Sequence, residues 1–182
     1  YEVSNRQFDQ FEGQAEDVSR WTNPTQPRDT ITWYEARDFC AVRGARLPTE
    51  LEWEYAARGV DGLTYPWGDE FVSTLSINAE NSVGETHAIS SYAIGASWVG
   101  AYHMLGNVSE WTSSLYLPYP FNASDGREDM NAEGNRVARG GSYTSIREQL
   151  STVNRFSYDP DASVRMVGFR CARDFSPNDV QG

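Results

Sequence analysis

The stretch that decides the fold is RLPTELEWEYAARG, residues 46–59, because it contains a helix together with its start and stop signals. The Thr49 hydroxyl can accept a backbone N–H of the first turn, and the Glu52 carboxylate can reach back to complete a capping box. Gly59 can adopt the left-handed backbone that ends a helix. The spacing predicts a helix between these signals that buries Leu51, Tyr55 and Ala56.

A second helix of the same design precedes this stretch. Thr32 and Glu35 form another capping box, and Gly44 ends the helical pattern. Four apolar residues fall on one face at helical spacing and are expected to be buried: Trp33, Ala36, Phe39 and Cys40.

The pattern changes after residue 60, where Gly, Asn, Ser, Pro and aromatic residues dominate. Short apolar stretches between turn residues predict short strands at 88–92, 101–105, 136–138 and 167–172, and alternation predicts another at 1–8. Together with the two helices, these strands predict a loop-rich α+β fold in one domain.

Composition excludes several classes of function. The 182 residues carry a net charge of −11, and all 15 basic residues are arginine. An acidic chain repels phosphate backbones, which argues against nucleic acid as a partner. The absence of lysine excludes Schiff-base and phosphate-loop lysines, and two His and two Cys are too few for a multi-His or multi-Cys zinc site. No apolar run approaches the roughly 18 residues that a transmembrane helix needs.

Several short strings follow one another along the chain: RLPTE at 46–50, EWEYAARG at 52–59, YPWG at 65–68, GNVSEW at 106–111, RGGSY at 139–143 and GFRC at 168–171. Together they resemble the formylglycine-generating enzyme family, also called sulfatase-modifying factors, over nearly the whole chain. The resemblance implies one domain over 1–182 with a C-type-lectin-like fold, little regular secondary structure, two helices and small antiparallel sheets. It also implies a C-terminal tail over 174–182 and a first strand missing upstream of Tyr1.

Enzymes of this family use two thiols that hold copper(I) to oxidise a peptide cysteine to formylglycine. The motif match places these two positions at Ser145 and Leu150. Copper(I) prefers thiolate sulfur, whereas a hydroxyl is a poor ligand and an alkyl chain is none. We therefore expect no bound copper and no formylglycine synthesis. A different reaction in the same cleft would need an acid, base or nucleophile, and no His, Cys or Lys lies nearby in the sequence.

The resemblance also implies that Cys40 and Cys171 form a disulfide. That bond would close a loop of about 130 residues, would contribute up to roughly 4–5 kcal/mol, and would indicate a periplasmic, cell-surface or secreted location. One alternative is a pair of buried thiols that pack as small apolar groups. A reactive Cys–His site is a weaker alternative, because both cysteines lie on faces predicted to be buried.

Two calcium sites are implied by the family, each built from oxygen ligands in loops. The first would consist of Asn78, Ala79, Asn81 and Val83. The second would consist of Gly106, Val108 and Glu110. His103 stands where the second site needs an oxygen ligand, which argues against that site. Ordinary turn chemistry is the alternative for the asparagines of the first site.

Seven of the 15 arginines fall between Arg136 and Arg173, so the acidic chain contains a cationic segment. In the family this segment lines the peptide-binding cleft, and in related lectin-like proteins it forms the displayed binding surface. The resulting candidate contact residues are Ser142, Tyr143, Ser145, Arg147, Asn154 and Arg155. The alternative is that most of these arginines are internal ties, Arg170 above all.

These observations predict a non-catalytic domain that binds a protein or peptide, or an accessory subunit of a larger extracytoplasmic assembly. The first alternative is the family's sulfatase-modifying oxidase. The second is a C-terminal sensor domain of a longer regulatory protein.

Overall fold

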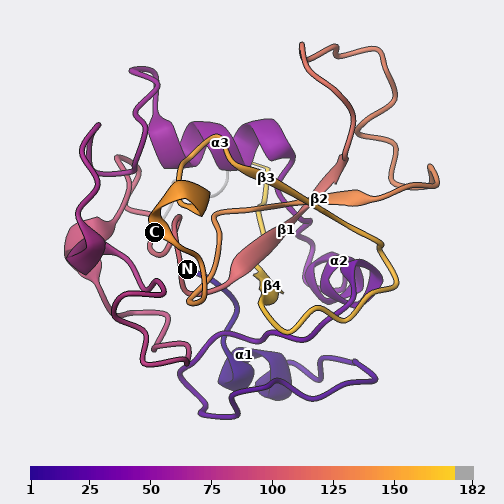
Figure 1. The fold of residues 1–182 in the computed structure, drawn as a ribbon. Coiled ribbons are helices and arrows are strands. Elements are labelled where there is room, and N and C mark those ends of the chain that lie inside the picture. The colour runs from indigo at the N-terminus through magenta and orange to yellow at the C-terminus, as the bar shows by residue number, and fades with distance from the viewer. Residues whose placement is uncertain (175–182) are drawn as a thin grey trace, which may run out of the picture.

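The computed structural model describes residues 1–174, and the tail predicted over 174–182 falls almost entirely outside the described residues. Its elements, in chain order, are α1 (Asn5–Gln10), α2 (Trp33–Ala41), α3 (Glu50–Arg58), η1 (Ser73–Leu75), η2 (Ala93–Gly95), β1 (Ser109–Leu115), β2 (Arg136–Arg139), η3 (Arg147–Gln149), β3 (Arg155–Tyr158) and β4 (Val167–Phe169). Helices surround one small sheet, and long loops project from it (Figure 1). This arrangement confirms the loop-rich α+β class with small strands.

The start of the chain corrects the sequence analysis, which predicted a strand over 1–8. Ser4 instead caps α1, with its hydroxyl accepting the Gln7 N–H and the Gln7 side chain accepting the Ser4 N–H. This reciprocal pair is a capping box, so a helix signal was present. The alternating apolar residues Val3 and Phe8 are buried, but they lie on either side of the helix start rather than along one strand.

The two predicted helices form, each with its capping box and with the four predicted residues of α2 buried. The buried face of α3 differs from the prediction. Leu51 and Tyr55 are 41% and 52% exposed, and the residues turned inward are Glu50, Trp53 and Ala57. Glu50 is drawn inside because two arginines of the sheet bind it, which no helical periodicity reveals.

The sheet has the order β3-β2-β1-β4. β1 pairs antiparallel with β2 and parallel with β4, and β2 pairs antiparallel with β3. The strands predicted at 136–138 and 167–172 are confirmed as β2 and β4, whereas 88–92 and 101–105 form turns and bends. β1 and β3 were missed; β1 reads SEWTSSL, a polar sequence that is nevertheless buried along its whole length.

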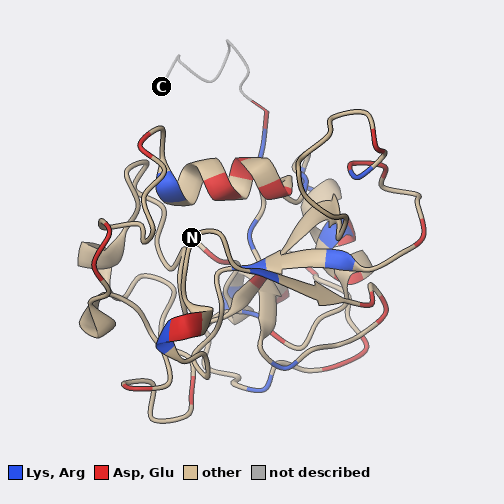
Figure 2. Cartoon of the chain, turned by 45° about the horizontal axis from the view of Figure 1, so that its top comes forward, with Lys and Arg blue, Asp and Glu red and all other residues tan. Residues whose placement is uncertain are grey.

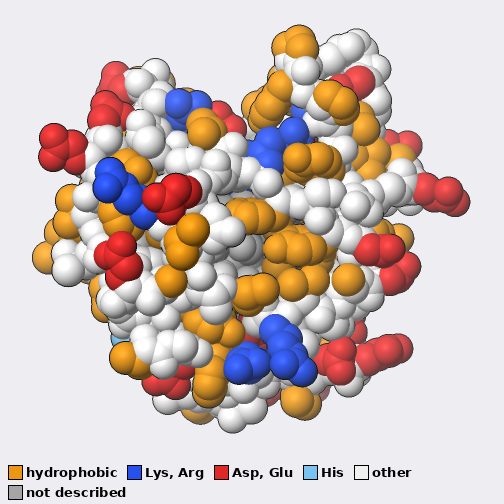
Figure 3. All heavy atoms as spheres, in the orientation of Figure 1, with side chains coloured by type: hydrophobic (Ala, Val, Ile, Leu, Met, Phe, Trp, Pro, Cys, Tyr) orange, Lys and Arg blue, Asp and Glu red, His pale blue; other side chains and the backbone are white. Residues whose placement is uncertain are grey.

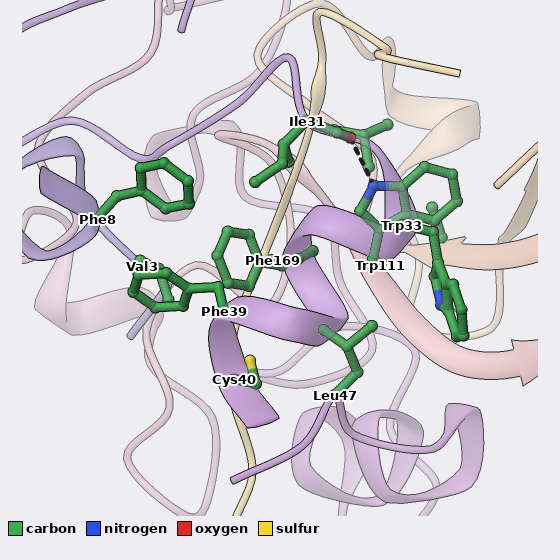
Figure 4. Packing of buried hydrophobic residues seen from close by; sticks show 12 residues of the cluster. Val3, Phe8, Ile31, Trp33, Phe39, Cys40, Leu47, Trp111 and Phe169 are labelled. Carbon is green, nitrogen blue, oxygen red and sulfur yellow. Dashed lines mark hydrogen bonds between the residues drawn. The ribbon is translucent and has the colours of Figure 1, made fainter. Parts of the chain in front are cut away.

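The main core lies where α1 and α2 pack against the sheet. Phe39 stacks on Phe8 and contacts Phe169 edge to face, while the Trp111 indole donates a hydrogen bond to the carbonyl of Ile31 (Figure 4). The disulfide implied by the resemblance is present at the edge of this core. It joins Cys40 of α2 to Cys171 just beyond β4. The bond therefore links α2 to the last strand, and its two cysteines are 131 residues apart in the sequence.

Candidate functional site

The connection between β2 and β3, residues 140–154, contains both positions at which the family carries its copper-binding thiols. Gly140 and Gly141 both have positive φ angles, +94° and +68°, which favour glycine. A Cβ added to Gly141 would lie 3.0 Å from the Ser145 hydroxyl and 3.0 Å from a Leu150 methyl group. The Ser145 hydroxyl and a Leu150 methyl group therefore lie close to the same point beside Gly141, so the glycine turn brings the two positions together.

The Ser145 hydroxyl belongs to the turn itself. Its oxygen accepts the Ser142 backbone N–H at 3.0 Å, and its backbone carbonyl accepts the Ala79 N–H at 3.1 Å. The residue is only 6% exposed. Ser145 thus fixes the turn and attaches it to a neighbouring loop.

Leu150 fills the other position as a core residue. It is 1% exposed and packs in a second apolar cluster that includes Trp53, Tyr65, Met104 and Leu105. A hydroxyl bound to the backbone and an alkyl chain inside a core supply no thiolate, so this pair does not fit copper(I). No step through copper follows from these residues.

The other predicted contact residues divide into two groups. Ser142 and Tyr143 are 3% and 4% exposed, and the Arg155 side chain is 10% exposed, so together with Ser145 they face the interior. Arg147 is exposed and stacks over Phe71, and Asn154 is half-buried. Contact of these six residues with a partner stays a prediction, and Arg147 and Asn154 offer more side-chain surface for it than the other four.

Four of the seven arginines between Arg136 and Arg173 are turned inward, whereas Arg147, Arg165 and Arg173 are exposed. Arg136, Arg139 and Arg170 are at most 9% exposed, and in Figure 2 arginines mark the strands while acidic residues mark α3 and the loops. Arg139 binds Glu50 at 2.9 Å and Glu54 at 2.7 Å, and Arg136 donates to four backbone carbonyls. Arg136, Arg139 and Arg170 are therefore internal ties, which is the alternative that the sequence left open.

Glu110, the acid of the second predicted calcium site, is completely buried and saturated by protein donors. Arg170 binds it through two nitrogens at 2.5 and 2.6 Å, and the Trp53 indole donates to it at 2.8 Å. His103 is buried too, and burial together with the charge of Arg170 lowers its pKa to about 4. Glu110 is thus already bonded to a guanidinium and an indole, and calcium at Glu110, Gly106 and Val108 stays a prediction.

A second buried acid, Glu2, lies close to this ion pair and was missed by the sequence analysis. Its carboxylate accepts hydrogen bonds from the Asn107 amide at 2.8 Å and from the Val108 N–H at 3.3 Å. Burial, with the negative charge of Glu110, raises the pKa of Glu2 to about 8. No pattern in the sequence around Glu2 indicates its contact with Asn107, which is 105 residues away.

The first predicted calcium loop is held by its own side chains. The Asn78 and Asn81 amide nitrogens both donate to the carbonyls of Ser73 and Ser76, and each amide oxygen accepts one backbone N–H. Together with the carbonyls of Ala79 and Val83, these oxygens form a set of neutral ligands, typical of weak calcium sites. Calcium at this loop stays a prediction. Within residues 1–174, no three His, Cys, Asp or Glu side chains are grouped to hold a metal.

A model of the sulfatase-modifying factor enzyme 1-like domain matches residues 1–175, and the chain belongs to this family. It is 35% identical over 158 residues to the inactive C-alpha-formylglycine-generating enzyme 2 of Bos taurus, covering 78% of this chain and 48% of the relative. It is 34% identical over 183 residues to the formylglycine-generating enzyme of Streptomyces coelicolor, covering 90% and 57%. It is 40% identical over 180 residues to the hercynine oxygenase of Mycolicibacterium thermoresistibile, covering 89% and 38%.

The chain thus spans about half the length, or less, of these curated relatives. Among solved structures, PvdO from Pseudomonas aeruginosa superposes with a TM-score of 0.82 at 22% identity, covering 96% of this chain and 78% of that one. This likeness confirms the formylglycine-generating-enzyme type of C-type-lectin-like fold. No helix within the described residues is long and apolar enough to cross a membrane.

Proposed function

We propose that this domain is a non-catalytic member of its family that binds a protein or peptide, as a recognition module or accessory subunit of a larger extracytoplasmic assembly. The observation that carries the proposal is the role of Ser145 and Leu150, which stand where the family has its two thiols. Ser145 is bonded to its own turn, and Leu150 is packed in a core. A relative named as inactive supports the same conclusion.

The second candidate is an oxidase, because the relatives also include a formylglycine-generating enzyme and an oxygenase. A titration of the purified protein with copper(I), followed by incubation with a cysteine-containing sulfatase peptide under oxygen, separates the two. We expect neither stoichiometric copper binding nor an aldehyde product. Either result from the unmodified protein would overturn the proposal.

A matched variant makes the negative result informative. In Ser145→Cys with Leu150→Cys, the two thiols would lie close together beside Gly141, and they would meet the preference of copper(I) for thiolates. We expect this double variant to bind about one copper(I) per chain under conditions in which the unmodified protein binds none.

An extracytoplasmic location is supported by the disulfide between Cys40 and Cys171, since such bonds persist in oxidising compartments. Alkylation of the protein taken directly from its host cells tests this location. We expect both cysteines to resist labelling until a reductant is added; labelling without reductant would contradict the proposal.

A further inference from the structure

Three aromatic rings of the segment that follows β1 alternate with two guanidinium groups. One guanidinium belongs to Arg127 of the same segment, and the other belongs to Arg155 of β3. The Arg155 guanidinium lies 4.5 Å from the ring centres of both Tyr116 and Tyr119. The Arg127 guanidinium lies 5.9 Å from the ring centre of Tyr119 and 4.7 Å from that of Phe121. The order is therefore ring, cation, ring, cation, ring. We call the three residues Tyr116, Tyr119 and Phe121 the aromatic ridge.

Both cations of this stack are fixed by bonds to the protein. Arg155 binds the two oxygens of Glu50 at 2.5 and 2.8 Å and donates to the carbonyl of Leu117. Arg127 binds Asp125 at 2.6 Å and donates to the carbonyl of Pro118. Their side chains are 10% and 1% exposed, so they hold the rings in place and offer almost no charge to a partner.

The rings themselves remain accessible. Tyr116, Tyr119 and Phe121 are 42%, 48% and 36% exposed. The segment between β1 and β2 projects from the sheet, and at the corresponding place in the space-filling view hydrophobic atoms gather beside arginine atoms (Figures 1 and 3). Rigid aromatic side chains lose little conformational entropy on binding and are enriched among residues that dominate interface energies.

The charge around the ridge selects the partner. The same projecting segment carries three exposed acidic residues besides Asp125, which is paired with Arg127: Glu128, Asp129 and Glu133. Its two arginines, Arg127 and Arg136, are each 1% exposed. The faces of aromatic rings also attract cations. The accessible surface here is therefore apolar and anionic, which complements a peptide with Arg or Lys next to apolar residues.

We propose that the aromatic ridge is the docking surface for a basic segment of a partner protein. This inference rests on the proposed function as a binding module and adds to it the surface and the partner's chemistry. Cationic side chains would pack against the outer faces of Tyr116 and Phe121, which the two arginines leave open, and would face the exposed acids, while the neighbouring apolar residues would pack against the ring edges.

Fluorescence anisotropy with the labelled peptide GRLGRLGRLG, and with a counterpart in which Glu replaces each Arg, tests the proposal. We expect saturable binding of the basic peptide and at least tenfold weaker binding of the acidic one. Replacing the ridge by Tyr116→Ala, Tyr119→Ala and Phe121→Ala should weaken the basic peptide's binding at least tenfold. The net charge is unchanged in this variant, so non-specific attraction to the acidic protein would survive it.

Two control variants guard against indirect effects. Tyr55→Ala with Trp98→Ala removes two other exposed rings, 52% and 51% exposed, and should leave binding unchanged. Tyr119→Phe keeps the ring and should bind as the unmodified protein does, even if the triple variant is loosened.

The ridge proposal is overturned if the basic peptide does not bind, if the triple variant binds it equally, or if the acidic peptide binds as tightly. These outcomes concern binding alone. Aldehyde formation in the oxidase assay would instead overturn the proposed function and leave the ridge measurement standing, so the two failures are distinguishable.

Discussion

The two connections that flank β2 differ in the kind of side chain that they bury. The β2–β3 connection turns its side chains inward, with Ser145 and Leu150 at most 6% exposed. The β1–β2 connection buries Arg127 and displays Tyr119 and Phe121. One loop thus contributes an apolar side chain to a core, while the other uses charged groups as its buried support.

The two loops are stabilised by different kinds of contact. Small hydroxyls in the β2–β3 connection satisfy one another and the turn, which leaves Leu150 free to pack. In the β1–β2 connection, guanidinium groups satisfy carbonyls and carboxylates at their edges while their flat faces support aromatic rings. The first loop is therefore held by the buried residues Ser145 and Leu150, and the second is pre-organised to present its aromatic rings.

The largest expected effect comes from removing the Glu50 carboxylate, which binds the arginine that supports Tyr116 and Tyr119. Glu50→Gln leaves Arg139 and Arg155 without their shared buried anion. We expect the free energy of unfolding to fall by about 3–5 kcal/mol, because buried charges lose their partner. Urea denaturation measures the change, with Glu148→Gln on the exposed surface as the control. A loss no larger than that of the control would show that Glu50 is not a structural tie.

A slightly smaller effect is expected in the inward connection. Leu150→Ala should lower the free energy of unfolding by about 3 kcal/mol, since it removes buried methyl groups and leaves a cavity. Val153→Ala, at a residue that is 46% exposed in the same connection, is the matched control. Equal losses for the two variants would contradict the packing described for Leu150.

Acidity tests the ion pair next to the inward connection, since Asn107 binds both Glu2 and the Tyr143 N–H. The folded protein keeps a proton on Glu2 up to a pKa of about 8, whereas the unfolded chain releases it near 4.5. The contribution to the free energy of unfolding is therefore greatest at low pH and is lost as pH rises through this window.

We expect a loss of about 1 kcal/mol between pH 6.5 and 7.5 that disappears in Glu2→Gln. This interval avoids the opposite effect of His103, whose lowered pKa makes stability rise with pH between about 4 and 6.5. Urea denaturation at the two pH values gives the slopes. Identical slopes for the two proteins would mean that Glu2 is ionised in the folded state.

The smallest effect concerns calcium at the first predicted calcium loop, which contains Asn78 and Asn81 and in which the Ala79 N–H donates to the Ser145 carbonyl. Because all its ligands are neutral, calcium near its dissociation constant should contribute only about 0.4 kcal/mol. We expect millimolar calcium chloride to raise the melting temperature slightly, and Asn81→Asp to enlarge the rise by adding a charge. Magnesium chloride at equal concentration is the control. No calcium-specific rise in either protein would remove the calcium prediction.

Much of the local structure was predictable because its signals are local. Thr32 and Thr49, each followed three residues later by glutamate, marked both helices correctly, and Ser4 with Gln7 carried the same signal for α1. β1 escaped prediction because its burial does not follow hydrophobicity. Its hydroxyls bind groups elsewhere in the chain, as Ser114 binds Glu128, so polar residues are buried without an apolar pattern.

The sequence by itself determined the chemistry that the β2–β3 connection can offer, since no folding turns a hydroxyl and an alkyl chain into copper ligands. It also determined the helix limits and, through the family, the cysteine pair. Only the tertiary structure decided which charges face inward and which rings face out. An arginine can be buried where carboxylates or carbonyls from other segments bind it, and Arg139 binds Glu50 at a separation of 89 residues, which no local pattern indicates.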